Sequence, residues 1–227
     1  MSESSSSDTE QTTQASSDAG MGAVWARLAH AQVLRLRALT VLGVLAVAVL
    51  PWVGSAWPVS GWVHQGIEWL GLGLILTAIL GRCSCMLYLG GRKGADLVAE
   101  GPYSVSRNPL YVFSILAVMG IGLQTGSLVV GFVLALAAFA VFHWIVVEEE
   151  RMLRAAFGAR FDAYCVRVPR FWPRPSVWRS PRHVMVDLGG LWKTARDALP
   201  YFLAVPLFEA IEAIQAAGWV HVQVRLF

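Results

Sequence analysis

The sequence predicts an all-α fold, a polytopic membrane helical bundle of four transmembrane helices with a cytoplasmic C-terminal amphipathic helix. Hydrophobic residues make up 56% of the 227 residues and charged residues only 15%, whereas a soluble domain has about half and about a quarter. Apolar stretches of the length of a membrane span recur along the chain. We therefore expect the lipid bilayer as a partner, and with a formal net charge of only +3 we expect no nucleic acid.

Three segments divide the chain. Residues 1–22 are rich in Ser, Thr and Asp and lack Lys and Arg, which predicts a disordered tail. Residues 23–173 contain the apolar stretches and form the predicted membrane domain, and residues 174–227 follow it as a basic linker and an interfacial helix. Within the membrane domain, Ala23–Arg37 interleaves Trp and Leu with Arg. That pattern is typical of an interfacial helix or of a charged flank before the next span.

The first two predicted spans are Ala38–Trp57 and Trp62–Leu89. The first has 20 residues without a charge, which suffices for one crossing at about 1.5 Å per residue. The second is longer than one crossing needs and contains Glu68, expected at the outer interface, and Arg82. The Arg82 side chain either reaches the cytoplasmic interface, which we favour, or faces a ligand cavity inside the bundle.

Leu110–Gln124 and Leu128–Val147 predict two further spans, joined by Thr-Gly-Ser as a tight antiparallel hairpin. Lys and Arg gather before the first span, between the second and third, and after the fourth, while the two opposite loops contain none. By the positive-inside rule, the N-terminus and both charged ends of the hairpin are cytoplasmic.

The stretch 101–111, Gly-Pro-Tyr-Ser-Val-Ser-Arg-Asn-Pro-Leu-Tyr, leads into this hairpin. Its Gly-Pro pair interrupts regular structure, and Pro109 suits the first position of a helix. Arg107 and Asn108 are therefore expected at a helix N-terminus, where free backbone N–H groups attract an anion.

An acidic run, Glu148–Glu150, lies at the other end of the hairpin. The 37 residues between Tyr111 and Glu149 are what two crossings require, so the chain returns to the same face and one pocket can use both motifs. From Glu149 to Tyr164, apolar residues recur at helical spacing opposite arginines. This predicts an amphipathic helix docked against the cytoplasmic ends of the spans.

The ordered motifs resemble the isoprenylcysteine carboxyl methyltransferase and phospholipid methyltransferase superfamily, integral membrane enzymes that use S-adenosylmethionine. The resemblance consists of Gly-Pro-Tyr-x3-Arg-Asn-Pro-x-Tyr, an apolar hairpin, Glu-Glu-x2-Leu-x3-Phe-Gly and a Val-Pro-Arg-Phe ending, within residues 97–173. It implies methyl transfer to a lipid, or to a lipidated or apolar small-molecule acceptor, at the cytoplasmic membrane face. Asn108 stands where the carboxyl methyltransferases typically have His, and Phe161 where the family often has Tyr, so the acceptor stays open.

The resemblance also implies a cofactor site built from both motifs. The residues carried over as cofactor-binding are Gly101, Pro102, Tyr103, Arg107, Asn108, Pro109, Glu149 and Glu150. Arg107 and Tyr111 are carried over as catalytic: Arg107 binds the methionine carboxylate or orients the acceptor, and Tyr111 lines the methyl-transfer path. The glutamates hold the ribose or the amino group. Carboxylates and an arginine are suitable partners for the hydroxyls and the carboxylate of this cofactor.

A histidine and three cysteines stand near these motifs. His143 lies seven residues before Glu150, and it either reaches the site or makes one hydrogen bond inside the bundle. The cysteines, Cys83, Cys85 and Cys165, lack the spacing of a zinc site, so we expect no metal.

Beyond the resemblance, the segment from Arg174 onward begins as a basic linker, in which Pro175 and Pro181 stand among several arginines, and such a linker suits an anionic membrane surface. Leu199–Trp219 is apolar but contains Pro206, Glu209 and Glu212. Two carboxylates inside a span are costly, which favours an interfacial helix over a fifth crossing.

Two other classes of function fit parts of the pattern. An NADPH-dependent membrane reductase of the sterol-reductase type shares an Arg-His-Pro-x-Tyr-like element, but Glu-Glu-x2-Leu-x3-Phe-Gly argues against it. A non-catalytic membrane scaffold with a vestigial pocket would have no cofactor affinity.

Overall fold

The computed structural model describes residues 37, 40–41, 43–45, 48–89 and 97–227. The predicted tail, 1–22, and the predicted interfacial helix over 23–37 lie outside these residues, apart from residue 37. So do the connecting residues 90–96.

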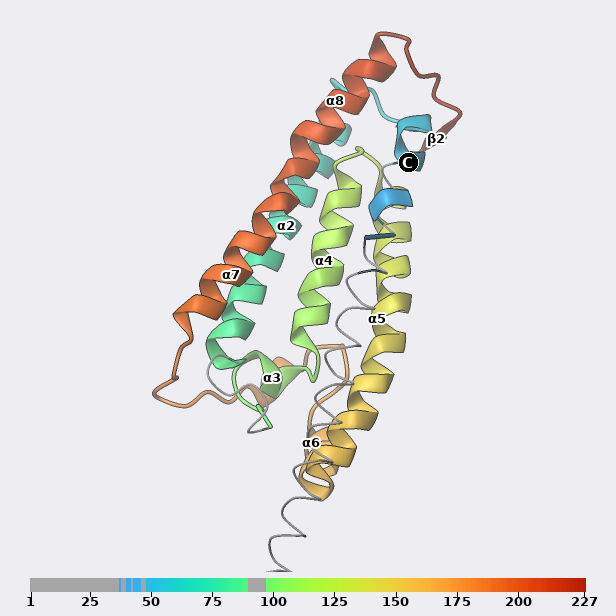
Figure 1. Cartoon of the computed structure of the whole chain (residues 1–227). Helices are drawn as coiled ribbons and strands as arrows, with labels where there is room; N and C mark the ends of the chain where they lie inside the picture. The colour runs from blue at the N-terminus through green and yellow to red at the C-terminus, as the bar shows by residue number, and fades with distance from the viewer. Residues whose placement is uncertain (1–36, 38–39, 42, 46–47, 90–96) are drawn as a thin grey trace, which may run out of the picture.

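Three antiparallel helices form the centre of the fold (Figure 1): α2 (Trp62–Leu89), α4 (Pro109–Leu123) and α5 (Leu128–Phe157). Glycines allow α2 and α4 to approach closely, because a Cβ on Gly71 or Gly120 would overlap the backbone oxygen of the other. Gly122 and Gly131 form a similar contact between α4 and α5. Such small residues are common where membrane helices pack together.

The second predicted span coincides with α2, and the predicted hairpin is α4, the turn 125–127 and α5. Gly126 takes a positive φ of 66° in that turn. Ser127 then caps α5, because its hydroxyl accepts a hydrogen bond from the Val130 N–H.

The predicted amphipathic helix over 149–164 is wrong in its bounds. Helix α5 continues without a break through the acidic run to Phe157, and Gly158, with φ 51°, separates it from α6 (Ala159–Arg167). Glu149 and Glu150 are therefore carried on the same rigid helix as the apolar span. The predicted docking of the second half is retained, because Phe161 and Tyr164 of α6 are buried.

The first predicted span, Ala38–Trp57, differs at its end. Its described residues are helical up to the 3-10 turn η1 (Leu50–Trp52). The chain then leaves the helix and forms strand β1 (Val53–Ser55), which pairs in parallel with β2 (Val224–Leu226). The last residues of the predicted span are thus not helical, because this part of the chain pairs with the C-terminal strand.

The C-terminal segment forms α7 (Leu188–Ala198), the 3-10 turn η3 (Leu199–Leu203) and α8 (Ala204–Ala216), which run together along the bundle beside α2 (Figure 1). Phe208 of α8 packs with Leu50 and Val130. The helix expected within 199–219 is thus present but split, and its α8 end lies beside the turn 125–127.

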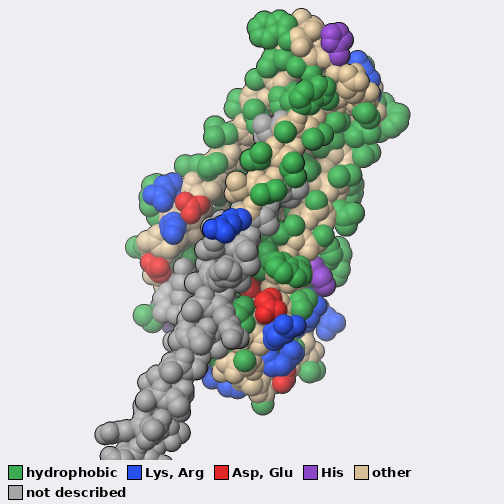
Figure 2. Space-filling view, turned by 45° about the vertical axis from the view of Figure 1, so that its right-hand side comes forward, with side chains coloured by type: hydrophobic (Ala, Val, Ile, Leu, Met, Phe, Trp, Pro, Cys, Tyr) green, Lys and Arg blue, Asp and Glu red, His purple; other side chains and the backbone are tan. Residues whose placement is uncertain are grey.

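Apolar side chains cover the length of the bundle, while charged side chains gather mainly toward the end that holds α6 (Figure 2). The largest exposed apolar residues on α2 and α5 are Trp62, Trp69, Leu80, Phe132, Leu136 and Trp144. Within the described residues, α2 and α5 are long and apolar enough to cross a membrane, whereas α4 has 15 residues. A continuous exposed apolar surface of this kind indicates membrane association.

Candidate active site

The turn that opens the first motif is set by glycine and two prolines. Gly101 has φ 58°, and a Cβ there would overlap the Tyr88 ring. Pro102 begins the short helix α3 (Pro102–Val105), and Pro109 begins α4 with Asn108 as its N-cap. The predicted helix N-terminus is confirmed, and the glycine and prolines shape the loop.

Arg107 is held between the two motifs. Its backbone N–H donates to the Pro169 carbonyl at 2.8 Å, and its Nη1 lies 3.1 Å from Oε1 of Glu150 and 3.0 Å from Sγ of Cys165. The side chain is only 14% exposed. The loop before α4 and the end of α5 are therefore joined by an ion pair, as the two-crossing spacing predicted.

Glu150 is paired with two arginines. Besides Arg107, it accepts bonds from Nε and Nη2 of Arg170 at 3.1 and 2.8 Å, and its side chain is 5% exposed. These bonds raise the pKa of the Arg170 guanidinium, so this cation stays charged beside Glu150. We call Arg107, Glu150 and Arg170 the arginine cluster. Because both oxygens of Glu150 are engaged, it is better placed to orient the arginines than to hold a ribose.

Glu149 faces a different partner from Glu150. The Tyr111 hydroxyl donates to Oε1 of Glu149 at 2.7 Å, and the Tyr111 ring packs on Phe142 with 4.9 Å between ring centroids. Tyr111 is buried in an apolar cluster that includes Phe171. A charge-assisted hydrogen bond thus lies at the edge of a buried, aromatic-lined region.

Two tyrosines lie behind the arginine cluster. The Tyr164 hydroxyl donates to the backbone carbonyl of Tyr103 at 2.7 Å, and burial raises the pKa of both phenols. Both therefore stay protonated and can donate hydrogen bonds. The Tyr103 hydroxyl has no hydrogen-bond partner among the described residues.

Arg82 faces the inside of the bundle, contrary to the favoured expectation. Its Nη1 donates to the Ser114 hydroxyl of α4 at 2.6 Å, so the guanidinium is directed from α2 toward α4. Glu68 lies near the opposite end of α2. Of the two charged residues discussed on this span, Glu68 and Arg82, only Arg82 thus lies near the motifs.

Three buried polar atoms at this end of the bundle lack partners within the described part of the chain: Oη of Tyr103, Nε of Arg107 and Nε of Arg82. A buried donor without a partner is unusual and costs about 1–3 kcal/mol. S-adenosylmethionine carries a carboxylate, ribose hydroxyls and ring nitrogens that accept hydrogen bonds, and so the donor set fits this cofactor.

Sequence reasoning missed three contributors. Arg170 belongs to the Val-Pro-Arg-Phe ending quoted above but was not identified as a site residue. Its place in that motif, shortly after the acidic run, was a usable signal. Asn108 contacts the backbone of Arg170, since its side-chain amide donates a hydrogen bond to the Arg170 carbonyl at 3.2 Å. Cys165 contacts Arg107 and Phe171 joins the aromatic region, and no sequence pattern indicated either contact.

His143 is exposed on α5. Its ring stacks on Phe171 with 5.9 Å between centroids and lies 5.8 Å from Phe139. It therefore borders the aromatic region from outside and does not enter the arginine cluster.

The comparisons with known proteins agree with the motifs. The family profile described as phospholipid methyltransferase matches residues 67–160. The chain is 34% identical to the nickel-cobalt-cadmium resistance protein NccN of Alcaligenes xylosoxydans xylosoxydans, over 70% of this chain and 74% of that protein. It is also 34% identical to the cobalt-zinc-cadmium resistance protein CzcN of Cupriavidus metallidurans, over 73% and 76%. No solved structure matches the chain.

Proposed function

The chain belongs to the phospholipid methyltransferase family, within the isoprenylcysteine carboxyl methyltransferase-like membrane methyltransferases, and on this premise we propose that it transfers a methyl group from S-adenosylmethionine to an apolar acceptor. The acceptor is a lipid, or a lipidated or apolar small molecule. The reaction takes place at the cytoplasmic face of the membrane.

The observation that carries the proposal is the meeting of the two motifs. Arg107 and Tyr111 come from the loop and first turn of α4, and Glu149 and Glu150 come from α5, yet Tyr111 contacts Glu149 and Arg107 contacts Glu150. Either motif alone is compatible with a topology signal or a solvated helix. Buried pairing between them is what a shared site requires.

The bound cofactor would supply a methyl group on a positively charged sulfonium. Arg107 binds the methionine carboxylate, and its ion pair with Glu150 fixes the guanidinium in place. Glu149 accepts hydrogen bonds from the amino group or the ribose, and Tyr111 orients Glu149. The aromatic region around Phe142 and Phe171 excludes water from the acceptor side.

The acceptor approaches from the bilayer in this proposal. The exposed apolar faces of α2 and α5 lead toward the site end of the bundle, so a lipid-like molecule can reach it without crossing water. The basic residues around both motifs support a cytoplasmic position for this end by the positive-inside rule. There the cofactor, a polar nucleoside, is available.

The names of the two relatives add a physiological setting. NccN and CzcN are named for resistance to nickel, cobalt, cadmium and zinc, and we propose that methyl transfer by this chain also acts in resistance to divalent metals. The setting can be tested by growth of a metal-sensitive host in graded CoCl2 with the wild type or Arg107→Ala. Equal protection by both would contradict it.

Binding of S-adenosylhomocysteine to the detergent-purified full chain tests the catalytic proposal, measured by isothermal titration beside NADPH. We expect micromolar affinity for S-adenosylhomocysteine and a loss of about tenfold or more in Arg107→Ala, since a charge-assisted pair is lost. Arg160→Ala is the matched control, because Arg160 is exposed at the same end of the molecule, and it should bind as the wild type does.

Two results would contradict the proposal. Binding of NADPH instead would indicate the reductase alternative. No binding of either molecule, in protein whose circular dichroism shows it to be folded, would indicate a scaffold.

A further inference from the structure

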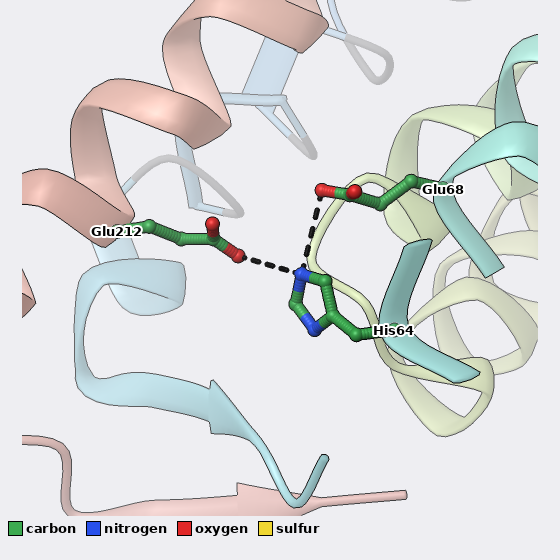
Figure 3. Close-up of side chains that lie close together, drawn as sticks. All are labelled: His64, Glu68 and Glu212. Carbon is green, nitrogen blue, oxygen red and sulfur yellow. Dashed lines mark ion pairs between the residues drawn. The ribbon is translucent and has the colours of Figure 1, made fainter. Parts of the chain in front are cut away.

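A second polar cluster lies at the end of the bundle opposite the arginine cluster. His64 and Glu68 of α2 and Glu212 of α8 point toward one another (Figure 3). Nε2 of His64 lies 3.1 Å from Oε1 of Glu212 and 3.4 Å from Oε1 of Glu68. One donor atom from each residue lies within 4.8 Å of the other two. We call these residues the histidine cluster.

His64 is fully buried, with a side-chain exposure of 0%. The turn before α5 covers it, since a Cβ on Gly126 would overlap its ring. Neither ring nitrogen makes a hydrogen bond of good geometry with any described residue, although Nε2 faces both carboxylates. A buried imidazole directed in this way needs a further partner.

The charge balance indicates what the partner is. Two carboxylates face one imidazole, and a single proton on Nε2 can be shared well with only one of them. A divalent cation would neutralise both carboxylates and accept the lone pair of a neutral imidazole.

The separations fit the ligands of such an ion. With bonds of about 2.0–2.2 Å, neighbouring ligand atoms of a small divalent metal lie about 3.0 Å apart in octahedral and about 3.4 Å apart in tetrahedral coordination. The His64 nitrogen shows these separations from its two carboxylates. His64 and Glu68 also stand one helical turn apart, so both side chains project from the same face of α2, as paired ligands on one helix do.

An ion can reach this position from outside. A cavity of about 220 Å³ borders Glu212 and is lined by β1, the turn at Thr125 and α8. Arg225 is the other charged residue in its lining. Water in the cavity could complete the coordination.

We propose that His64, Glu68 and Glu212 bind one divalent transition-metal ion of the zinc type, which fastens α8 to α2. One imidazole nitrogen and two carboxylates with a water position suit Zn²⁺ or Co²⁺ better than Ca²⁺, which takes six to eight oxygens. The sequence expectation of no metal was drawn from cysteine spacing alone. This site uses none of the cysteines, and the inference does not depend on methyl transfer.

Titration of the full chain with ZnCl2 tests the site, in detergent after removal of any affinity tag and treatment with a chelator. We expect one Zn²⁺ per chain at micromolar or tighter affinity, and at least a tenfold loss in Glu68→Gln and in Glu212→Gln. Glu209→Gln is the matched control, because Glu209 is exposed on the same helix, and it should retain the affinity. Arg107→Ala should retain it too, which separates this site from the proposed cofactor site.

Co²⁺ provides a second readout. We expect visible absorption bands from the bound ion in the wild type and in Glu209→Gln, and their loss in Glu212→Gln. Circular dichroism of the metal-free variants shows that each is folded. The inference is overturned if the folded wild type binds no Zn²⁺, or if Glu68→Gln and Glu212→Gln bind it as tightly as the wild type.

Discussion

The two polar clusters at opposite ends of the bundle have opposite charge balances. In the arginine cluster one carboxylate lies between two guanidinium groups, and in the histidine cluster one imidazole lies between two carboxylates. The first has bonds to both carboxylate oxygens. The second leaves both ring nitrogens without a hydrogen bond among the described residues.

The difference shows that burial of charge serves two purposes in one fold. The arginine cluster holds itself together, so it can fix the loop before α4 against α5 before any ligand arrives. The histidine cluster lacks a counter-charge of its own, so its contribution to stability depends on what binds there. Removing a carboxylate should therefore lower the free energy of unfolding at the arginine cluster. At the histidine cluster without metal, the same change should leave that free energy nearly unchanged or raise it.

The largest effect is expected for Glu150→Gln. The substitution leaves Arg107 and Arg170 close together without their shared anion, and breaking a buried ion pair typically costs about 3–5 kcal/mol. We expect the free energy of unfolding in detergent to fall by about 3 kcal/mol, because Arg170 is 36% exposed and water can partly replace its partner. Chemical denaturation followed by circular dichroism measures this change.

The control for this prediction is Glu148→Gln. Glu148 pairs with Arg151, and both side chains are more than half exposed, so the loss should be at most about 1 kcal/mol. Equal losses in the two variants would mean that the buried pairing at Glu150 adds nothing to stability.

A glycine substitution separates the histidine cluster from the arginine cluster. Gly126→Ala introduces a Cβ at φ 66° and into the His64 ring, whereas Gly158→Ala introduces one at φ 51° into open space. Both variants incur backbone strain, but only the first also overpacks the interior. We expect Gly126→Ala to lose about 2 kcal/mol more in the free energy of unfolding.

The same pair of variants should differ in zinc affinity and agree in S-adenosylhomocysteine affinity. Displacement of His64 alters the histidine cluster, while the arginine cluster at the other end keeps its contacts. If Gly126→Ala weakened cofactor binding as much as zinc binding, the two ends would not be independent.

A smaller effect is expected for Tyr111→Phe. The variant loses the hydrogen bond to Glu149 but keeps the ring against Phe142, so the free energy of unfolding should fall by about 1 kcal/mol. Tyr88→Phe is the matched control, because its hydroxyl bonds to Ser180 in an exposed position and should cost little. If methyl transfer uses Glu149 as proposed, Tyr111→Phe also lowers the affinity for S-adenosylhomocysteine, and Tyr88→Phe does not.

The contrast between the ends also explains what the sequence could predict. The helices α2, α4 and α5 follow from apolar length and from the Thr-Gly-Ser turn, since these are local signals. The contacts of Arg107 and Tyr111 with the acidic run follow from the length of a two-crossing hairpin. The helix break at Gly158 was not predicted, because an isolated glycine inside a helical pattern is tolerated at a cost of about 1 kcal/mol and does not by itself mark a helix end.

The histidine cluster could not be predicted, because its members come from distant parts of the chain. His64 and Glu68 share a helix face, but Glu212 lies 144 residues after Glu68, on a helix that was expected at an interface. Its approach depends on the packing of α8 against the bundle and on the pairing of β1 with β2. Neither contact leaves a local signal in the sequence, whereas the acidic run and the motif 101–111 do.

The smallest effect, and the one that separates the two ends most directly, is expected for Glu212→Gln without metal. Removing one of two facing carboxylates relieves repulsion, so the free energy of unfolding should change by less than about 0.5 kcal/mol or rise. With saturating ZnCl2 the wild type should become the more stable of the two proteins. Its free energy of unfolding rises by about 2.7 kcal/mol at a hundred times its dissociation constant for zinc, and that of the variant rises by less. Thermal unfolding of both proteins with and without ZnCl2 measures this reversal. A large loss of stability in the metal-free variant would instead mean that His64 is protonated and paired with Glu212, and that the histidine cluster is held together as the arginine cluster is.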